Sequence, residues 1–117
     1  MTKNIIFEGG RETAFTSNAA TPIRYRQIFG EDLMTAITQT GASSLSIDMV
    51  KRLAYVMALQ GAGGDFRGAS EETLISWLED YEEMDFIDHA QDIISIWIDS
   101  SKRTSTAKKK DGRPTGK

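Results

Sequence analysis

The chain lacks the residues on which several classes of protein depend. None of its 117 residues is cysteine, so disulfides, thiolate metal sites and a cysteine nucleophile are excluded. No apolar run approaches the length of a membrane span. The N-terminal segment contains only three consecutive apolar residues, too few for a secretory signal. We therefore expect a cytoplasmic protein with no membrane contact.

Histidine is almost as scarce, since His89 is the only one. Asp85 and Asp92 lie four residues before it and three after it, so the three side chains can share one helical face. Such a cluster can bind a divalent metal, but a solvated acidic face is the more common role. A serine triad would need this same histidine. We expect no enzymatic activity, no metal and no cofactor.

Phosphate-binding loops are also missing. The glycine-rich segment at residues 61–70 has no lysine of the kind that a P-loop requires, and it follows a predicted helix, whereas a dinucleotide fingerprint follows a strand. We interpret it as a connector between helices.

Charge is divided unevenly along the chain. Residues 101–117 carry seven basic side chains against Asp111 alone, a charge of +6, so the first 100 residues must carry −9 to give the net charge of −3. An acidic body repels nucleic-acid phosphate, and only the tail can attract it. We expect a folded domain over residues 1–101 and a disordered basic tail over residues 102–117.

The apolar pattern predicts a mainly α-helical domain of about five helices behind an N-terminal β-hairpin. Gly9 and Gly10 separate two short extended runs, which favours strands at residues 4–8 and 11–15. Thr21, Ser46 and Ser70 are suited to be N-caps, and Gly30 to end the first helix. Helices are expected at residues 22–29, 33–40, 47–60, 71–83 and 85–101.

The helix that begins at residue 47 is apolar over most of its circumference, which predicts that it is buried at the centre of the domain. Trp77 and Trp97 fall on the apolar faces of the last two helices. Each can be a core residue or an anchor for a partner. Tyr25, Phe29, Phe66 and Trp77 are the candidates for a partner-binding face.

The order of these features resembles the tail assembly chaperones of long-tailed bacteriophages and prophages of Gram-positive hosts. The resemblance covers nearly the whole chain. Its most specific segments are TPIRYRQIFGEDL (residues 21–33), LAYVMA (53–58), WLEDYEEMDF (77–86) and TSTAKKK (104–110).

The resemblance implies a non-enzymatic assembly role. Such chaperones coat the long tape measure protein while the tail tube polymerises around it, and they are absent from the mature virion. Many are made in two lengths by a ribosomal frameshift, and the longer form recruits tail tube subunits. The resemblance also implies a host-cytoplasmic location. We further expect self-association along the tape measure.

The basic tail leaves two readings open. In the first, Lys108, Lys109 and Lys110 mark a run of A-rich codons at which ribosomes slip. The segment before these lysines is then the tether to an extension, and residues 111–117 are read when slipping fails. In the second, the protein is a small nucleic-acid-associated regulator that uses the tail. The acidic body, and the absence of an aromatic residue in the tail on which bases could stack, argue against the second.

Overall fold

The computed structural model describes residues 1–35 and 47–100. It begins with an antiparallel hairpin of strands β1 (Thr2–Ile6) and β2 (Glu12–Thr16), joined through the 3-10 turn η1 (Glu8–Gly10). The predicted hairpin is confirmed, but its strands lie farther from the glycines than expected. The Phe7 N–H donates to the Arg11 carbonyl, which closes a five-residue connection. Gly10 takes the left-handed φ of +87° that this turn requires.

The hairpin contributes aromatic residues to the core. Phe7 and Phe15 are both buried, and their rings meet edge to face at 6.3 Å. Phe7 also contacts the rings of Tyr81 and Phe86 at 5.4 and 6.2 Å. A two-stranded sheet is marginal alone in water, so these contacts with the helices stabilise the hairpin.

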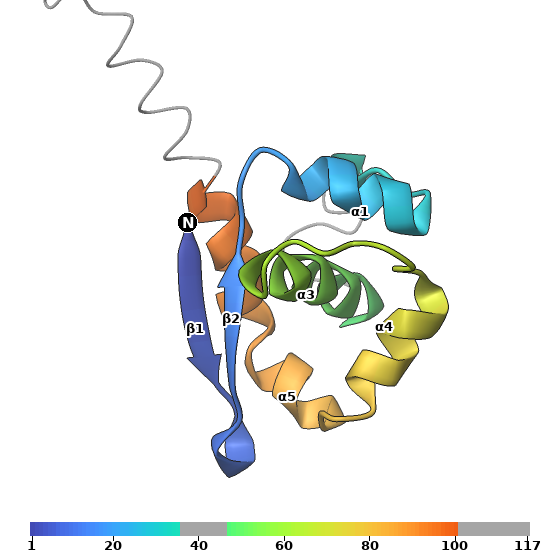
Figure 1. Cartoon of the computed structure of the whole chain (residues 1–117). Coiled ribbons are helices and arrows are strands. Elements are labelled where there is room, and N and C mark those ends of the chain that lie inside the picture. The colour runs from blue at the N-terminus through green and yellow to red at the C-terminus, as the bar shows by residue number, and fades with distance from the viewer. Residues whose placement is uncertain (36–46, 101–117) are drawn as a thin grey trace, which may run out of the picture.

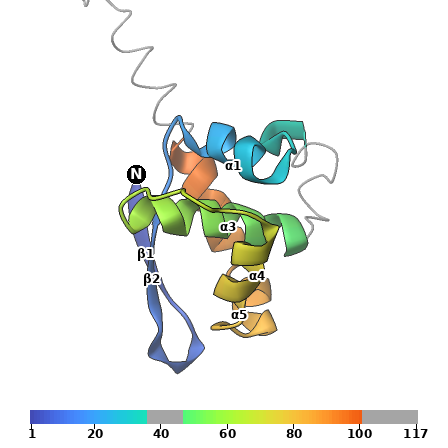
Figure 2. The ribbon, with the colours of Figure 1, turned by 45° about the vertical axis from the view of Figure 1, so that its right-hand side comes forward.

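Helix α3 (Ile47–Gly61) forms the centre of the domain, as its apolar circumference predicted. β2 packs along one side of it, while α1 (Thr21–Phe29), α4 (Glu71–Leu78) and α5 (Glu83–Asp88) surround the remainder (Figures 1 and 2). Leu53, Val56 and Met57 have no exposed surface. The result is a compact, mainly helical domain with the hairpin on one flank.

The helix ends agree in part with the predicted caps. Ser70 caps α4, and its hydroxyl accepts a hydrogen bond from the Thr73 N–H. Gly30 ends α1 with a left-handed φ of +68°. The prediction that Thr21 is an N-cap is wrong, because Thr21 lies inside the helix. Its hydroxyl donates instead to the Gln60 side chain, which ties α1 to α3.

The helix predicted at residues 85–101 is divided at His89. α5 ends at Asp88, and residues 90–100 form a separate helix. The His89 backbone (φ −108°, ψ 13°) departs from helical geometry, and this turn lets Phe86 on one side and Ile93 on the other both reach the core. At residue 100 the second helix contacts the hairpin, where the Ser100 hydroxyl donates to the Ser17 carbonyl at 3.1 Å.

Parts of the sequence-based prediction fall outside the described residues. The helix expected at residues 33–40 is described only over 33–35, where the Asp32 carboxylate accepts from the Met34 N–H and the Thr35 hydroxyl. The Ser46 cap and the tail from residue 102 also lie outside. Across the two described segments, no helix is long and apolar enough to cross a membrane.

Candidate partner-binding surface

Tyr25, the first of the four aromatic candidates, lies inside the domain with no exposed surface. Its hydroxyl donates to a Glu31 carboxylate oxygen at 2.7 Å, and its ring meets Phe29 at 5.3 Å. Burial, together with the hydrogen bond and negative charge of Glu31, raises the pKa of Tyr25 well above its usual value. The phenol is therefore a neutral structural group that joins α1 to the segment after it.

The Trp77 side chain also makes its contacts within the domain. Its indole packs among the rings of Tyr55, Tyr81 and Phe86, at centroid distances of 5.5, 4.6 and 5.9 Å. It is half-buried at the edge of the core, whereas Trp97 is buried within it. Trp97 is thus a core residue, and Trp77 belongs to an aromatic cluster with side chains of α3 and α5.

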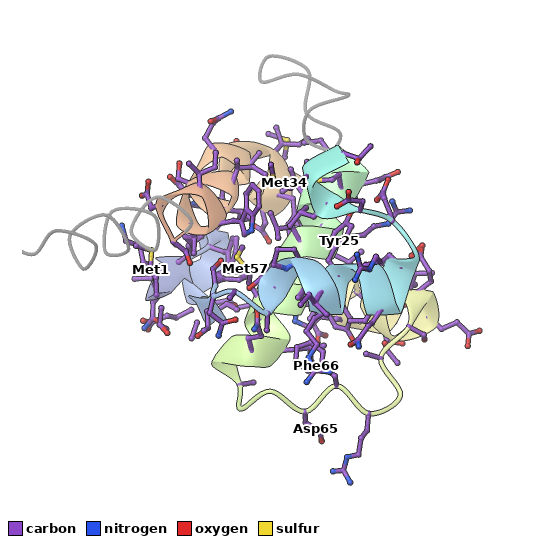
Figure 3. All side chains as sticks on the ribbon, turned by 90° about the horizontal axis from the view of Figure 1, so that it is seen from above. Met1, Tyr25, Met34, Met57, Asp65 and Phe66 are labelled. Atoms are coloured by element: carbon purple, nitrogen blue, oxygen red, sulfur yellow. The ribbon has the colours of Figure 1, made fainter. Side chains whose placement is uncertain are left out.

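Phe29 and Phe66 are partly exposed, and each lies beside an arginine. The Arg24 guanidinium lies 4.5 Å from the centre of the Phe66 ring, and that of Arg52 lies 5.7 Å from the Phe29 ring. Phe66 belongs to the glycine-rich loop, which passes beneath α1 (Figure 3). Both rings therefore attach neighbouring segments to the domain, and the four candidates do not form one exposed aromatic surface.

A different set of apolar side chains is exposed on α4 and α5. Ile75 is 56% exposed, Met84 is 53% exposed and Ile87 is 44% exposed. We refer to these three residues as the α4–α5 apolar surface. α4 and α5 are joined at a sharp corner that lies below α3 in the views of Figures 1 and 2. Aliphatic side chains of this size are favoured to be buried, so three on adjoining short helices are typical of a contact surface.

A shallow groove joins this surface to the central helix. Ile75 and Leu78 of α4 face Lys51 of α3 across a groove of about 200 Å³. Lys51, whose side chain is largely buried, forms an ion pair with Glu83 of α5 at 2.7 Å. Because Glu83 and Ile87 are one helical turn apart, they share a face of α5. The ion pair thus ties α5 to α3 beside the groove that α4 lines.

The segment of the chain that carries these apolar residues is acidic. No lysine or arginine occurs between Arg67 and Lys102. Ten acidic residues do occur there: Glu71, Glu72, Glu79, Asp80, Glu82, Glu83, Asp85, Asp88, Asp92 and Asp99. Asp85 is buried and accepts from the Glu82 N–H, while Glu79, Asp80, Glu82 and Asp88 are exposed around the corner. We refer to the exposed carboxylates Glu79, Asp80, Glu82 and Asp88, which flank the three apolar residues along the chain, as the acidic rim.

The predicted cluster around His89 has a structural explanation. His89 Nδ1 lies 3.0 Å from an Asp92 oxygen, but Asp85 uses its carboxylate to cap α5. Among residues 1–35 and 47–100, no group of three histidine, aspartate or glutamate side chains is placed to hold a metal ion.

The sequence indicates that Ile75, Met84 and Ile87 are exposed, although the aromatic residues were chosen as candidates instead. All three are apolar residues that fall off the core stripes of their helices: Ile75 is adjacent to the buried Leu74, and Ile87 to the buried Phe86. The aromatic residues were poorer markers, because large rings are as often core residues as partner anchors.

The fold and this surface together define a small, mainly helical domain with an exposed apolar face. No protein-family model, curated protein or solved structure matches the chain.

Proposed function

We propose that this protein is a bacteriophage tail assembly chaperone that binds the tape measure protein, keeps it soluble and helps to recruit tail tube subunits. The observation that carries the proposal is the α4–α5 apolar surface within its acidic rim. The resemblance of residues 21–33, 53–58, 77–86 and 104–110 to these chaperones supports it.

The surface suits a helical partner with an apolar stripe. A tape measure protein exposes such stripes until the tail tube encloses it, and an amphipathic helix binds through side chains at i, i+3 and i+7 spacing. Ile75, Met84 and Ile87 are each about half exposed. Covering them therefore contributes only about 1 kcal/mol per side chain. Such weak contacts, repeated over many copies, let the growing tube displace the chaperone.

The acidic rim supplies solubility and selectivity. Carboxylates repel one another across neighbouring copies, which opposes aggregation of the coated partner. They also favour a partner helix whose apolar stripe is flanked by lysine or arginine. The proposed role needs neither catalysis nor a cofactor, and it ends before the virion matures. We place it in the host cytoplasm.

The tail has a separate role in this proposal. Lys108, Lys109 and Lys110 mark the position of a ribosomal slip, after which a longer product carries the segment that recruits tail tube subunits. Sequencing the gene tests this directly, since the lysine codons must then form a slippery heptamer that precedes an overlapping frame.

The central experiment is co-expression with the protein encoded immediately downstream. We expect a long helical protein that is insoluble alone and soluble when many copies of this chain are bound. The double variant Ile75→Asp and Met84→Asp should abolish that rescue. Ile23→Asp is the matched control, because Ile23 is an isoleucine 49% exposed on α1, away from the α4–α5 corner.

Three results can be distinguished. Rescue that is lost only in the double variant supports both the function and the surface. Equal loss in the Ile23 control assigns the contact to another face. A downstream protein that needs no help, and does not co-purify, overturns the proposed function.

A further inference from the structure

A second surface lies along the free edge of β1. Lys3, Asn4, Ile5 and Ile6 form one wall of a groove of about 330 Å³, and the chain from His89 to Asp99 forms the other. In the described part of the chain, β2 is the only strand that pairs with β1. The outer edge of β1 is therefore open to this groove.

The hairpin register shows which backbone groups face outward. Met1 and Ser17 exchange hydrogen bonds, and the Phe7 N–H donates to Arg11, so the odd-numbered residues of β1 are bonded to β2. Hydrogen-bonded pairs alternate along an antiparallel ladder. The N–H and C=O groups of Thr2, Asn4 and Ile6 thus point away from β2. Within residues 1–35 and 47–100 they have no backbone partner.

The helical wall presents polar groups to the same groove. Asp92, Ser95 and Asp99 follow one another at spacings of three and four residues, which places them on one face of the helix. Asp99 forms no ion pair within the described residues, and Asp92 is bonded only to His89. An open strand edge opposite two carboxylates fits an extended segment that carries basic side chains.

The chain itself contains such a segment. We infer that residues 104–110 of the tail, TSTAKKK, add to the free edge of β1 as a third strand in the groove. Thr104 and Thr106 are β-branched residues that favour strands. In this register Lys102 and Arg103 lie near Asp99, and Lys108 and the following lysines lie near Asp92.

The position of residue 100, the last described residue, makes this geometry accessible. Residue 100 lies at the Met1 end of the hairpin, because Ser100 bonds to Ser17 and Ser17 to Met1. His89 lies at the opposite end, with its ring 5.0 Å from that of Phe7. A chain that leaves residue 100 and turns back runs parallel to β1. The five residues of β1 span about 17 Å, and seven extended residues of the tail reach about 23 Å.

Covalent attachment favours the chain's own tail over other occupants. The tail begins at the helix that lines the groove, so its effective concentration there is far above that of any free segment. An uncovered edge strand also invites pairing between molecules, which a tail strand would prevent. This inference does not depend on the proposed function.

Amide hydrogen exchange on the full chain tests the inference. The outward amides of Asn4 and Ile6 should exchange at least about tenfold more slowly than in the triple variant K108E/K109E/K110E, since a segment docked nine-tenths of the time leaves one-tenth open. Ile5, whose amide is bonded to β2, should be unchanged by the variant. Equal exchange at Asn4 and Ile6 in the two proteins overturns the inference.

A spin label on the tail tests whether the groove is filled by the chain's own tail or by that of a second copy. The chain has no cysteine, so Gly112→Cys gives a single labelling site. We expect broadening of the Ile6 and His89 amides, and none at Asp65. Asp92→Asn with Asp99→Asn should reduce the broadening, whereas Asp80→Asn should not. A second sample mixes spin-labelled chains without isotope enrichment and enriched chains without a label. Broadening of the Ile6 and His89 amides in this sample comes from the tail of another molecule, so it assigns the groove to a second copy and overturns the inference.

Discussion

At the scale of single residues, the buried hydroxyl of Tyr25 couples the stability of the domain to pH. It has no exposed surface and one acceptor, the Glu31 carboxylate. Ionising it would place a second negative charge beside Glu31 in a poorly solvated site. This is why its pKa is raised above the usual tyrosine value of 10.0.

We expect the protein to lose stability steeply above pH 10. The phenol remains protonated in the folded chain while the unfolded chain releases its proton, so each further pH unit lowers the free energy of unfolding by up to about 1.4 kcal/mol. Tyr25→Phe should be less stable at pH 8, through the lost hydrogen bond, but should show a shallower decline. Urea unfolding at pH 8 to 12 measures both. Equal slopes in the two proteins would contradict this assignment.

Gly61 is the second residue with a specific physical role. At the end of α3 it lies against β2, and a Cβ added there would meet the carbonyl group of Ala14 inside van der Waals contact. Only glycine permits this approach of helix to hairpin.

Gly61→Ala should therefore lower the free energy of unfolding by about 1–3 kcal/mol, even though alanine favours helix. Ala62→Ser, at the next and exposed position, is the control and should change it by less than about 0.5 kcal/mol. Chemical denaturation compares the two. A stabilised Gly61→Ala protein would show that the hairpin shifts freely on α3.

At the scale of elements, α4 depends on its first turn. It is only eight residues long, and isolated helices of that length are marginal. The Ser70 hydroxyl accepts from the Thr73 N–H, and the Thr73 hydroxyl accepts from the Ser70 N–H, which forms a reciprocal capping box.

Ser70→Ala should destabilise the protein by about 1 kcal/mol. Amide exchange should rise mainly in α4, with α3 little affected, because the cap holds the helix that carries Ile75. Thr13→Ala tests a hydrogen bond elsewhere, to Tyr81, and should leave α4 exchange unchanged. Uniform change across the domain after Ser70→Ala would show that α4 does not open separately.

At the same scale, the sequence predicted element types better than element ends. α3 has a strong apolar pattern and was predicted with its correct role, and Ser70 and Gly30 mark ends that the structure confirms. The break at His89 was not predicted, because the apolar residues before it and after it fit one continuous helical periodicity. At this break the His89 ring packs against Phe7, which lies more than 80 residues away along the chain.

At the scale of the whole molecule, charge separates the domain from its tail. The first 100 residues carry −9 and residues 101–117 carry +6. Opposite charges on one chain attract each other, so the domain competes with external phosphate for the tail.

We therefore expect weak binding to duplex DNA that disappears by about 150 mM salt, where the Debye length is about 8 Å. Fluorescence anisotropy over a salt series measures it. Asp92→Asn with Asp99→Asn should strengthen DNA binding at low salt, because it frees the tail. Tight binding at physiological salt, lost in K108E/K109E/K110E, would instead support the nucleic-acid regulator.

Sequence alone determined the class of fold, the central place of α3, the hairpin and the division of charge. Each depends on local pattern: apolar period, turn residues, caps and composition. The tertiary structure decided which apolar residues remain exposed. The side chains of Tyr25 and Trp77 contact residues from other parts of the chain, whereas Ile75, Met84 and Ile87 remain exposed. Exposure depends on what packs against a residue, and periodicity within one helix carries no information about that.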